Sequence, residues 1–413
     1  MKRKILFYSD CYIFGGCENL LVNLLGSEKI SDKYDIHYAY AWSKEYQAGV
    51  DQRFSSMPNR YPLRILSNNN LFYRIDLGGI NKHIAAVCKL PFHFLQKIGI
   101  YALYNYLRLF FLFKRLKPDL LHINNGGYPG ARSCLVAVFS AKMAGVPRII
   151  FNVNNQARKQ KNFVEKLFDR YIGDRVDYFT TASSLARTAL VERRRIPGEK
   201  VIQIFNAMRQ ESVGKKRAEL LAEFGVPDEK FVIATVAFLT ERKGQMFLLQ
   251  ALTDIRKKDP VLFEKMVLIL VGEGEDRFKI ESYIQQHDLV DKVVLTGNRR
   301  DYYDFINAAD LFVLPSTRDE DMPLVILSAM GLGKIIISTR VAGIIEEIRD
   351  NLDGVLLDPS QLHKLADTIV ELYYDEELRK QYGASALQRY HDYFALEKII
   401  GRYTDIYTEL IDR

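Results

Sequence analysis

The 413-residue chain has few cysteines, and their placement excludes two kinds of stabilised fold. Cys11, Cys17, Cys88 and Cys134 form no C-x-x-C pair, and all four lie in the first third of the sequence. Neither a zinc site nor a disulfide framework is therefore indicated. We expect reduced thiols and a cytoplasmic protein. The basic N-terminus is followed by too short an apolar run for an export signal, which agrees with this location.

Two glycine-rich phosphate-binding motifs are also missing. The dinucleotide fingerprint G-x-G-x-x-G does not occur, because Arg277 stands where the third glycine after Gly272 and Gly274 should be. The P-loop motif is absent as well, because Ile335 follows Lys334 where serine or threonine is required. A nicotinamide-dependent enzyme is therefore disfavoured, and a P-loop kinase is excluded.

Acidic residues are absent from one segment, residues 77–118, although the net charge of the whole chain is only +7. This segment carries seven cations: Lys82, Lys89, Lys97, Arg108, Lys114, Arg115 and Lys117. Its apolar run begins at Ile98 and is interrupted by Arg108, short of the roughly 18 residues that a membrane span requires. Two interpretations stay open: a helix buried against a sheet, or a helix that lies on an anionic membrane surface.

Short apolar runs alternate with helical stretches along most of the chain. The alternation runs from Ile5 to Phe205, pauses over a polar stretch at 209–217, and resumes with the apolar run 231–236. Repeated strand-then-helix order predicts parallel, doubly wound α/β sheets. We expect two Rossmann-like domains facing a cleft, residues 1–207 and 208–390, and a C-terminal helix in 391–413 that returns to the first domain.

Two loops that follow predicted strands have the composition of an anion site. Gly15 and Gly16 come after the first strand and open a helix, whose N-terminus favours an anion. Arg242 and Lys243 come after the first strand of the second half and precede Gly244, where a helix begins. An ammonium group beside free backbone N–H groups suits a diphosphate. A solvated pair of cations in a turn is the alternative for the second loop.

Two further loops at strand ends complete the candidate site. Gly297, Asn298 and Arg299 follow a buried strand at an edge where backbone groups can read a nucleotide base. The loop after the strand 311–314 places Glu320 where a ligand hydroxyl would lie, because ligands bind at the carboxyl ends of strands in open α/β sheets. Pro323 then opens the next helix.

Taken in order, these segments resemble the retaining glycosyltransferases of family 4, which have the GT-B fold. The resemblance covers nearly the whole chain. It is carried by Gly15-Gly16-x-Glu18, the segments 117–122 and 201–206, Leu239-x-x-x-Lys243-Gly244, and the segments 270–274, 293–297, 309–316, 329–330 and 343–346.

The resemblance implies transfer of a sugar, with retention, from a nucleotide diphosphate donor to a lipid-linked or polysaccharide acceptor. The C-terminal domain would bind the donor, and the N-terminal domain the acceptor. It assigns catalysis to Glu320, Lys243 and His122, with no metal and no cofactor besides the donor. It assigns donor binding to Gly15, Gly16, Arg242, Lys243, Gly297, Asn298, Arg299, Glu320, Met322, Pro323, Leu324 and Ser328.

The sequence departs from the family pattern at several of these positions. The second carboxylate of the paired-glutamate motif, which binds ribose in relatives, maps onto Ser328. The arginine that many relatives place before the Lys-Gly pair falls on Phe238, and Arg242 is its candidate replacement. Two histidine positions of relatives hold Asn124 and Asn154, so acid–base roles there are unsafe. His122 is either a packed imidazole or a site residue.

Three alternatives accompany this interpretation. A nucleotide-sugar epimerase of the same fold would need acid–base groups that Asn124 and Asn154 do not supply. A non-catalytic partner of a polysaccharide synthase would tolerate the loss of the second carboxylate. Asp319, Glu320 and Asp321 form a D-x-D pattern, whose oxygens suit magnesium or manganese. No nucleic-acid partner is expected.

Overall fold

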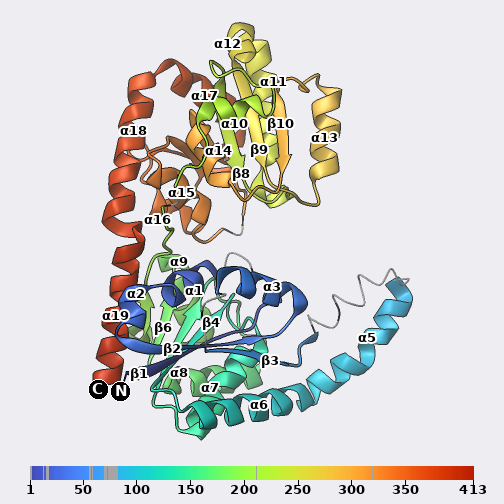
Figure 1. Ribbon diagram of the computed structural model, residues 1–413. Helices are drawn as coiled ribbons and strands as arrows, with labels where there is room; N and C mark the ends of the chain where they lie inside the picture. Colours follow the sequence, from blue (N-terminus) through green and yellow to red (C-terminus); the bar gives the residue numbers. More distant parts are fainter. Residues whose placement is uncertain are drawn as a thin grey trace. The chain divides into compact units, whose positions relative to one another are not determined.

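The computed structural model describes residues 2–12, 14, 18–54, 57, 59–68, 72, 82–210, 212–318 and 320–413. The chain divides into two compact units (Figure 1). Unit 1 consists of residues 1–204 and 399–413, and unit 2 consists of residues 205–398. Each unit is built on its own parallel sheet, which confirms the predicted fold class of two doubly wound α/β domains.

The sheet of unit 1 has seven strands in the order β3-β2-β1-β4-β5-β6-β7. All of its strand pairs are parallel. The strands are β1 (Arg3–Ser9), β2 (Tyr34–Ala41), β3 (Arg60–Leu63), β4 (Leu120–Asn125), β5 (Arg148–Val153), β6 (Tyr178–Thr181) and β7 (Val201–Gln203). The chain first moves outward from β1 to β2 and β3, and then returns to β4 on the other side of β1. The strand order therefore reverses between β1 and β4.

Helices cover both faces of this sheet because successive side chains along each strand point to opposite sides. Leu6 and Ile123 face a core shared with Leu109 and Ala137 on two of the helices. The helices of unit 1 are α1 (Asn19–Leu25), α2 (Glu28–Ser31), α3 (Lys44–Arg53), α5 (Lys82–Lys97), α6 (Ile100–Leu116), α7 (Arg132–Ala144), α8 (Phe163–Arg175), α9 (Ser184–Arg194) and most of α19 (Leu396–Asp412).

The basic segment forms two helices rather than one. Gly99 has φ of 87°, a left-handed conformation that ends α5 and starts α6. In α6, Leu109 and Phe113 are fully buried against the unit 1 core, whereas α5 extends away from the sheet (Figure 1). The part of the basic segment at 77–81 lies outside the described residues. The buried-helix interpretation therefore holds for one face of α6 and not for α5.

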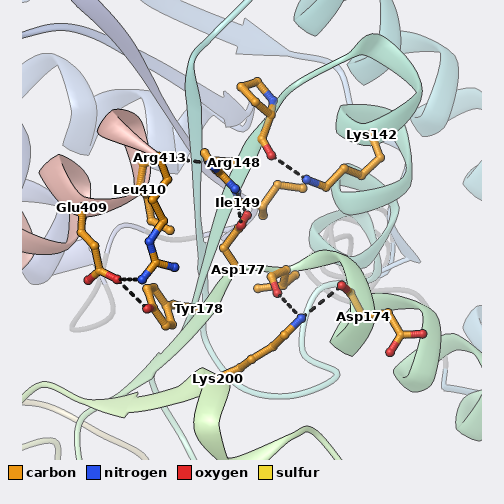
Figure 2. A network of polar contacts seen from close by, with 12 residues as sticks. Lys142, Arg148, Ile149, Asp174, Asp177, Tyr178, Lys200, Glu409, Leu410 and Arg413 are labelled. Atoms are coloured by element: carbon orange, nitrogen blue, oxygen red, sulfur yellow. Dashed lines mark hydrogen bonds and ion pairs between the residues drawn. The ribbon is translucent and has the colours of Figure 1, made fainter.

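The last helix, α19, contributes its final turns to a polar network of unit 1 (Figure 2). Arg148 on β5 donates from Nε to the carbonyl oxygen of Leu410 at 2.9 Å. The hydroxyl of Tyr178 on β6 donates to Oε1 of Glu409, also at 2.9 Å. These bonds satisfy carbonyl and carboxylate groups at the C-terminal end of the helix.

The sheet of unit 2 has six parallel strands in the order β10-β9-β8-β11-β12-β13. They are β8 (Phe231–Val236), β9 (Met266–Val271), β10 (Val293–Gly297), β11 (Leu311–Leu314), β12 (Ile336–Thr339) and β13 (Val355–Leu357). One face packs on α11 (Gln245–Lys258), α13 (Arg277–Gln286) and α17 (Leu365–Tyr374), and the other on α10 (Arg217–Ala222) and α14 (Tyr302–Ala308). Here the order reverses between β8 and β11.

The other helical elements of unit 2 lie between these strands and at its end. They are the 3-10 turns η3 (Glu241–Lys243) and η4 (Pro359–Lys364), α12 (Pro260–Lys265), α15 (Leu324–Gly331), α16 (Ile344–Glu347), α18 (Glu376–Arg389) and the π-helical turn η5 (Tyr390–Phe394). Within the described part of the chain, no helix combines the length and apolar character needed to cross a bilayer.

Candidate functional site

The reversal of strand order in unit 2 brings two of the predicted loops together. The loop after β8 contains Arg242 and Lys243, and the loop after β11 contains Glu320. Because β8 and β11 are neighbouring parallel strands, their carboxyl ends open at the same edge of the sheet. This edge is the place where open α/β sheets bind ligands. Residues 78 positions apart in sequence thus meet at one point.

Backbone contacts hold the loop after β8 against the loop after β11. The N–H of Thr317 donates to the carbonyl oxygen of Arg242 at 2.7 Å. Gly244 has φ of +75°, and a Cβ atom at this position would lie 2.0 Å from the carbonyl oxygen of Pro315. Only glycine permits both this conformation and this approach. The Lys-Gly pair is therefore needed to seat Lys243 beside Glu320.

The charged centre of the site consists of two cations on one carboxylate. Arg242 donates to Oε1 of Glu320 at 2.7 Å, and the ammonium group of Lys243 forms an ion pair with the same oxygen. The hydroxyl of Ser316 donates to it as well, at 3.2 Å. Lys243 and Glu320 are each 7% exposed. Burial lowers the pKa of Lys243, and the charge of Glu320 opposes that shift.

The helix after Glu320 positions Met322, Pro323, Leu324 and Ser328, which the resemblance assigns to donor binding. Met322 is buried, whereas Pro323 and Leu324 are half-buried at the start of α15. Ser328 is 2% exposed, and its hydroxyl donates to the carbonyl oxygen of Leu324 at 3.2 Å. Its hydroxyl is thus committed to its own helix.

The predicted base-reading edge lies at the end of β10. Gly297 has φ of +72° and accepts a hydrogen bond at its carbonyl oxygen from the N–H of Gly272, at 2.9 Å. The guanidinium of Arg299 donates to Asp301 at 2.6 and 2.7 Å and to Glu223 at 3.0 Å. The guanidinium of Arg299 therefore holds the loop to Asp301 and Glu223, and base recognition by the backbone around Asn298 stays a prediction.

The metal-site alternative rests on the same acidic loop. Asp319 of the D-x-D pattern lies outside the described residues. Glu320 is engaged by Arg242 and Lys243. Among the described residues, no three His, Cys, Asp or Glu side chains gather in a way that would hold a metal ion.

At the corresponding edge of unit 1, amide side chains follow β4 and β5, and the carboxyl groups of Asp10 and Glu18 lie beside the end of β1. Gly15 and Gly16 lie outside the described residues, so their predicted role stays a prediction. The amide of Asn152 donates to Oδ1 of Asn124 at 2.8 Å, and that of Asn154 donates to the same oxygen at 2.9 Å. The hydroxyl of Thr180 on β6 donates to Oδ1 of Asn152 at 2.9 Å. These amides tie the ends of β4, β5 and β6 together.

His122 on β4 lies in an aromatic cluster of unit 1. Its ring is fully buried, stacks on Phe7 at 5.0 Å between centroids, and shares a hydrogen bond of 2.7 Å between Nδ1 and the hydroxyl of Tyr407. Burial lowers its pKa to about 3, so the imidazole is neutral. These contacts are those of a packed imidazole, the first of the two interpretations given above, and they do not support a catalytic role.

A cavity of ≈ 390 Å³ lies within unit 1 beside the end of β1. It is lined by the loop after β3, by α5 and α6, and by the start of α7. Its polar lining includes Asp10, Asn68, His93, Gln96, Asn105 and Arg132. No sequence motif predicts this cavity, because its lining residues come from separate segments.

Solved structures share the fold of this chain. Solved structures with the same fold include HepE of Anabaena in complex with UDP, at a TM-score of 0.72 and 18% identity over 98% of this chain and 100% of that one. A glycosyltransferase of Rickettsia africae matches with a TM-score of 0.79 and 17% identity over 99% of each chain. The fold is that of the GT-B glycosyltransferases.

Part of unit 2 also matches a family by its sequence. Residues 216–389 match the family described as glycosyl transferases group 1. It is 26% identical to the N-acetyl-alpha-D-glucosaminyl L-malate synthase of Bacillus anthracis over 52% of this chain and 55% of that protein. The chain thus matches about half the length of that relative.

A second relative matches over more of the chain. It is the UDP-Gal:alpha-D-GlcNAc-diphosphoundecaprenol alpha-1,3-galactosyltransferase of Escherichia coli, at 22% identity over 73% of this chain and 78% of that protein.

Proposed function

We propose that this protein transfers a sugar, with retention of its anomeric configuration, from a nucleotide diphosphate sugar to a lipid-linked or polysaccharide acceptor. The donor binds at the carboxyl edge of the unit 2 sheet, at the loops of Arg242, Lys243 and Glu320. No metal or further cofactor is proposed. The observation that carries this proposal is the buried pair of Lys243 and Glu320 at the reversal of strand order.

The chemistry of this pair suits a departing diphosphate. When the bond between the sugar and the diphosphate breaks, negative charge grows on the leaving phosphate and positive charge on the sugar ring. A preorganised cation in a largely buried position stabilises the leaving group more than the intact donor. Lys243 supplies this cation. Glu320 orients it and carries a carboxylate suited to the developing positive charge or to a sugar hydroxyl.

The exposed face of α5 and α6 supports a lipid-linked acceptor. Apolar side chains spaced three or four residues apart project from both helices: Ile84, Val87, Leu90 and Phe94 on α5, and Ile100, Leu103, Leu107 and Phe111 on α6. All eight are exposed, by 42–65%. Between residues 82 and 117 the sequence has seven cations and no acid. This combination suits the cytoplasmic, anionic face of a membrane.

The unit 1 cavity is the proposed position of the acceptor headgroup. It is lined in part by α5 and α6, so an acceptor whose lipid lies in the membrane would present its polar end to this cavity. Amides, an imidazole, a carboxylate and a guanidinium line it, and these groups hydrogen-bond sugar hydroxyls and diphosphate oxygens.

Product analysis tests the proposed reaction. The purified protein is incubated with labelled UDP-, GDP- and ADP-sugars, first with water alone and then with a membrane lipid extract as the acceptor source. We expect label to move into the lipid fraction only when the extract is present, with the donor's anomeric configuration kept. Conversion of the donor to its epimer in water would instead show the epimerase, and no change with any donor would indicate a non-catalytic partner.

Vesicle sedimentation tests the membrane surface. We expect binding to vesicles that contain anionic lipid, weakening as salt is raised, and little binding to neutral vesicles. The double variant Phe94→Asp, Phe111→Asp should lose this binding. Phe278→Asp, at an 81% exposed position of unit 2, is the matched control and should bind like the natural protein. Equal sedimentation with neutral and anionic vesicles would contradict the proposal.

A further inference from the structure

The last residue of α16, Glu347, carries an unexplained carboxyl group. Glu347 is fully buried, and among the described residues neither of its side-chain oxygens has a hydrogen-bond partner. A buried carboxyl group without donors is costly, and buried polar groups without a partner are rare in folded proteins. The sequence gives no hint of this, because Glu346 and Glu347 resemble a solvated pair on a short helix.

The position of α16 places Glu347 next to the donor site. Gly343 precedes this helix, and a Cβ atom on it would lie 2.5 Å from the carbonyl oxygen of Asp321. The start of the helix is therefore in direct contact with the loop of Glu320. Burial raises the pKa of Glu347, and the charges of Glu320 and Asp321 add to this shift. The negative charge of Glu347 in turn acts to raise the pKa of Lys243.

The cation whose charge opposes the pKa shift of Glu347 is Arg389, and its hydrogen bonds go to other groups. Arg389 donates from Nε to the carbonyl oxygen of Glu347 at 2.8 Å and from Nη2 to that of Glu346 at 2.7 Å. It also lies 3.6 Å from Asp353. The guanidinium thus holds the backbone at the end of α16 in place. The side-chain oxygens of Glu347 are left for donors that come from elsewhere.

The residue expected to bind ribose is unsuited to the task. The resemblance to family 4 implies a second carboxylate eight residues after Glu320, and here that position is Ser328. Its hydroxyl donates to Leu324 within its own helix. The site therefore lacks one acidic group at Ser328 and has a surplus one at Glu347.

We propose that Glu347 accepts hydrogen bonds from the ribose hydroxyls of the bound nucleotide, and so replaces the carboxylate that is missing at Ser328. This inference rests on the proposed function, because it places a nucleotide donor at Lys243 and Glu320. Hydroxyl groups are donors, and a carboxyl group accepts from them in either protonation state. The diphosphate itself is repelled by a carboxylate, so it lies on the side of Lys243.

Binding of ribose and dideoxyribose nucleotides tests this role. Dissociation constants are measured by calorimetry for UDP and 2′,3′-dideoxy-UDP, and in parallel for the ADP and GDP pairs. We expect the natural protein to prefer one of the ribose forms by about tenfold or more. In Glu347→Met this preference should fall to about twofold, and Glu347→Gln should lie between. Ser328→Ala is the matched control and should keep the full preference.

The unfolding temperature of the nucleotide-free variants separates this role from a structural one. Removing an unpaired buried carboxyl group should leave the temperature of Glu347→Met unchanged or raise it. Retention of the full ribose preference by Glu347→Met would overturn the inference, and so would a large fall in its unfolding temperature. If the natural protein bound none of the three diphosphates, the proposed function would fail first. If it bound one without any preference for ribose, only this inference would fail.

Discussion

The two sheets of this protein reverse their strand order in the same way, yet the groups at the two reversals differ. In unit 2 the edge between β8 and β11 holds Arg242, Lys243 and Glu320, and two of these side chains are nearly buried. In unit 1 the ends of β4 and β5 hold the amides of Asn124 and Asn152, and the carboxyl group of Asp10 follows β1, with no cation bonded to it among the described residues. Both sheets thus have an edge of the kind at which open α/β sheets bind ligands, and the side chains at each edge determine what it binds.

The difference follows from how each edge satisfies its polar groups. The asparagine amides of unit 1 bond to one another and to Thr180, so they complete the sheet from within. In unit 2 two cations share one carboxylate oxygen, which leaves positive charge for an anion. We therefore infer that unit 2 binds the charged part of the donor and that the asparagines of unit 1 are structural. The predictions below test this contrast, beginning with the largest effect.

Replacement of Lys243 by methionine should have the largest effect. We expect kcat/KM for sugar transfer to fall by about 10²–10³-fold, as when one electrostatic stabiliser of a transition state is removed. The control is Lys334→Met, because Lys334 is also partly buried in unit 2 but its ammonium group donates to a neutral acceptor, the carbonyl oxygen of Asn307. Steady-state kinetics with the active donor decide the matter. Similar losses in both variants would contradict the account.

Replacement of Gly244 by alanine should destabilise unit 2. The new methyl group would meet the carbonyl oxygen of Pro315 at 2.0 Å in a left-handed conformation, so we expect a loss of about 3 kcal/mol or more. Gly225→Ala has the same kind of φ, +66°, with open space around it, and should cost only about 1 kcal/mol. Urea unfolding measures both. Equal costs would show that contact with Pro315 is unimportant.

The stability of unit 1 should depend on pH through His122. Its folded-state pKa of about 3 lies below its unfolded value, so the unfolded chain takes up a proton first as the pH falls. Stability is complete above about pH 6.5 and is lost towards pH 3, by up to about 1.4 kcal/mol per pH unit. Urea unfolding at pH 6.5 and 4.5 should show a smaller loss for His122→Phe than for the natural protein. An identical loss would contradict a neutral, packed imidazole.

Replacement of Asn152 by alanine should have the smallest effect of the four. It removes the donor to Asn124 and the acceptor for Thr180, and we expect about 1–2 kcal/mol of lost stability. Because these groups are structural, the dissociation constant for a nucleoside diphosphate should change by less than about twofold. Calorimetry checks this value. A tenfold higher dissociation constant would show instead that Asn152 takes part in nucleotide binding.

Much of the fold is evident in the sequence, because buried parallel strands are continuous apolar runs. Strand β3 is not, since it has four residues and contains Pro62. Helix α8 is also hard to predict. Phe163, Val164 and Phe168 are exposed, so the apolar residues of this helix do not mark its buried face. For the segment that forms α5 and α6, the sequence is compatible with a buried helix and with a helix on a membrane surface. The structure shows one buried face on α6 and an exposed apolar face on both helices.

The candidate site is predictable only where its residues follow strands. Lys243 and Glu320 were found for this reason, and their contact then follows from the pairing of β8 with β11. The burial of Glu347 cannot be predicted from the sequence near it. Helix α16 packs on the loop of Asp321, and this contact joins segments that are apart in the sequence. The role of His122 was ambiguous in the sequence for the same reason, since the hydroxyl of Tyr407 comes from the far end of the chain.

The central claim is that Lys243 gives unit 2 its preference for a diphosphate. Calorimetric titration of uridine and UDP, and of the corresponding adenosine and guanosine pairs, measures this preference as a ratio of dissociation constants. The account predicts that the natural protein binds one diphosphate at least tenfold more tightly than its nucleoside, and that Lys243→Met loses most of this ratio while its affinity for the nucleoside is unchanged. A variant that keeps the full ratio would contradict the claim.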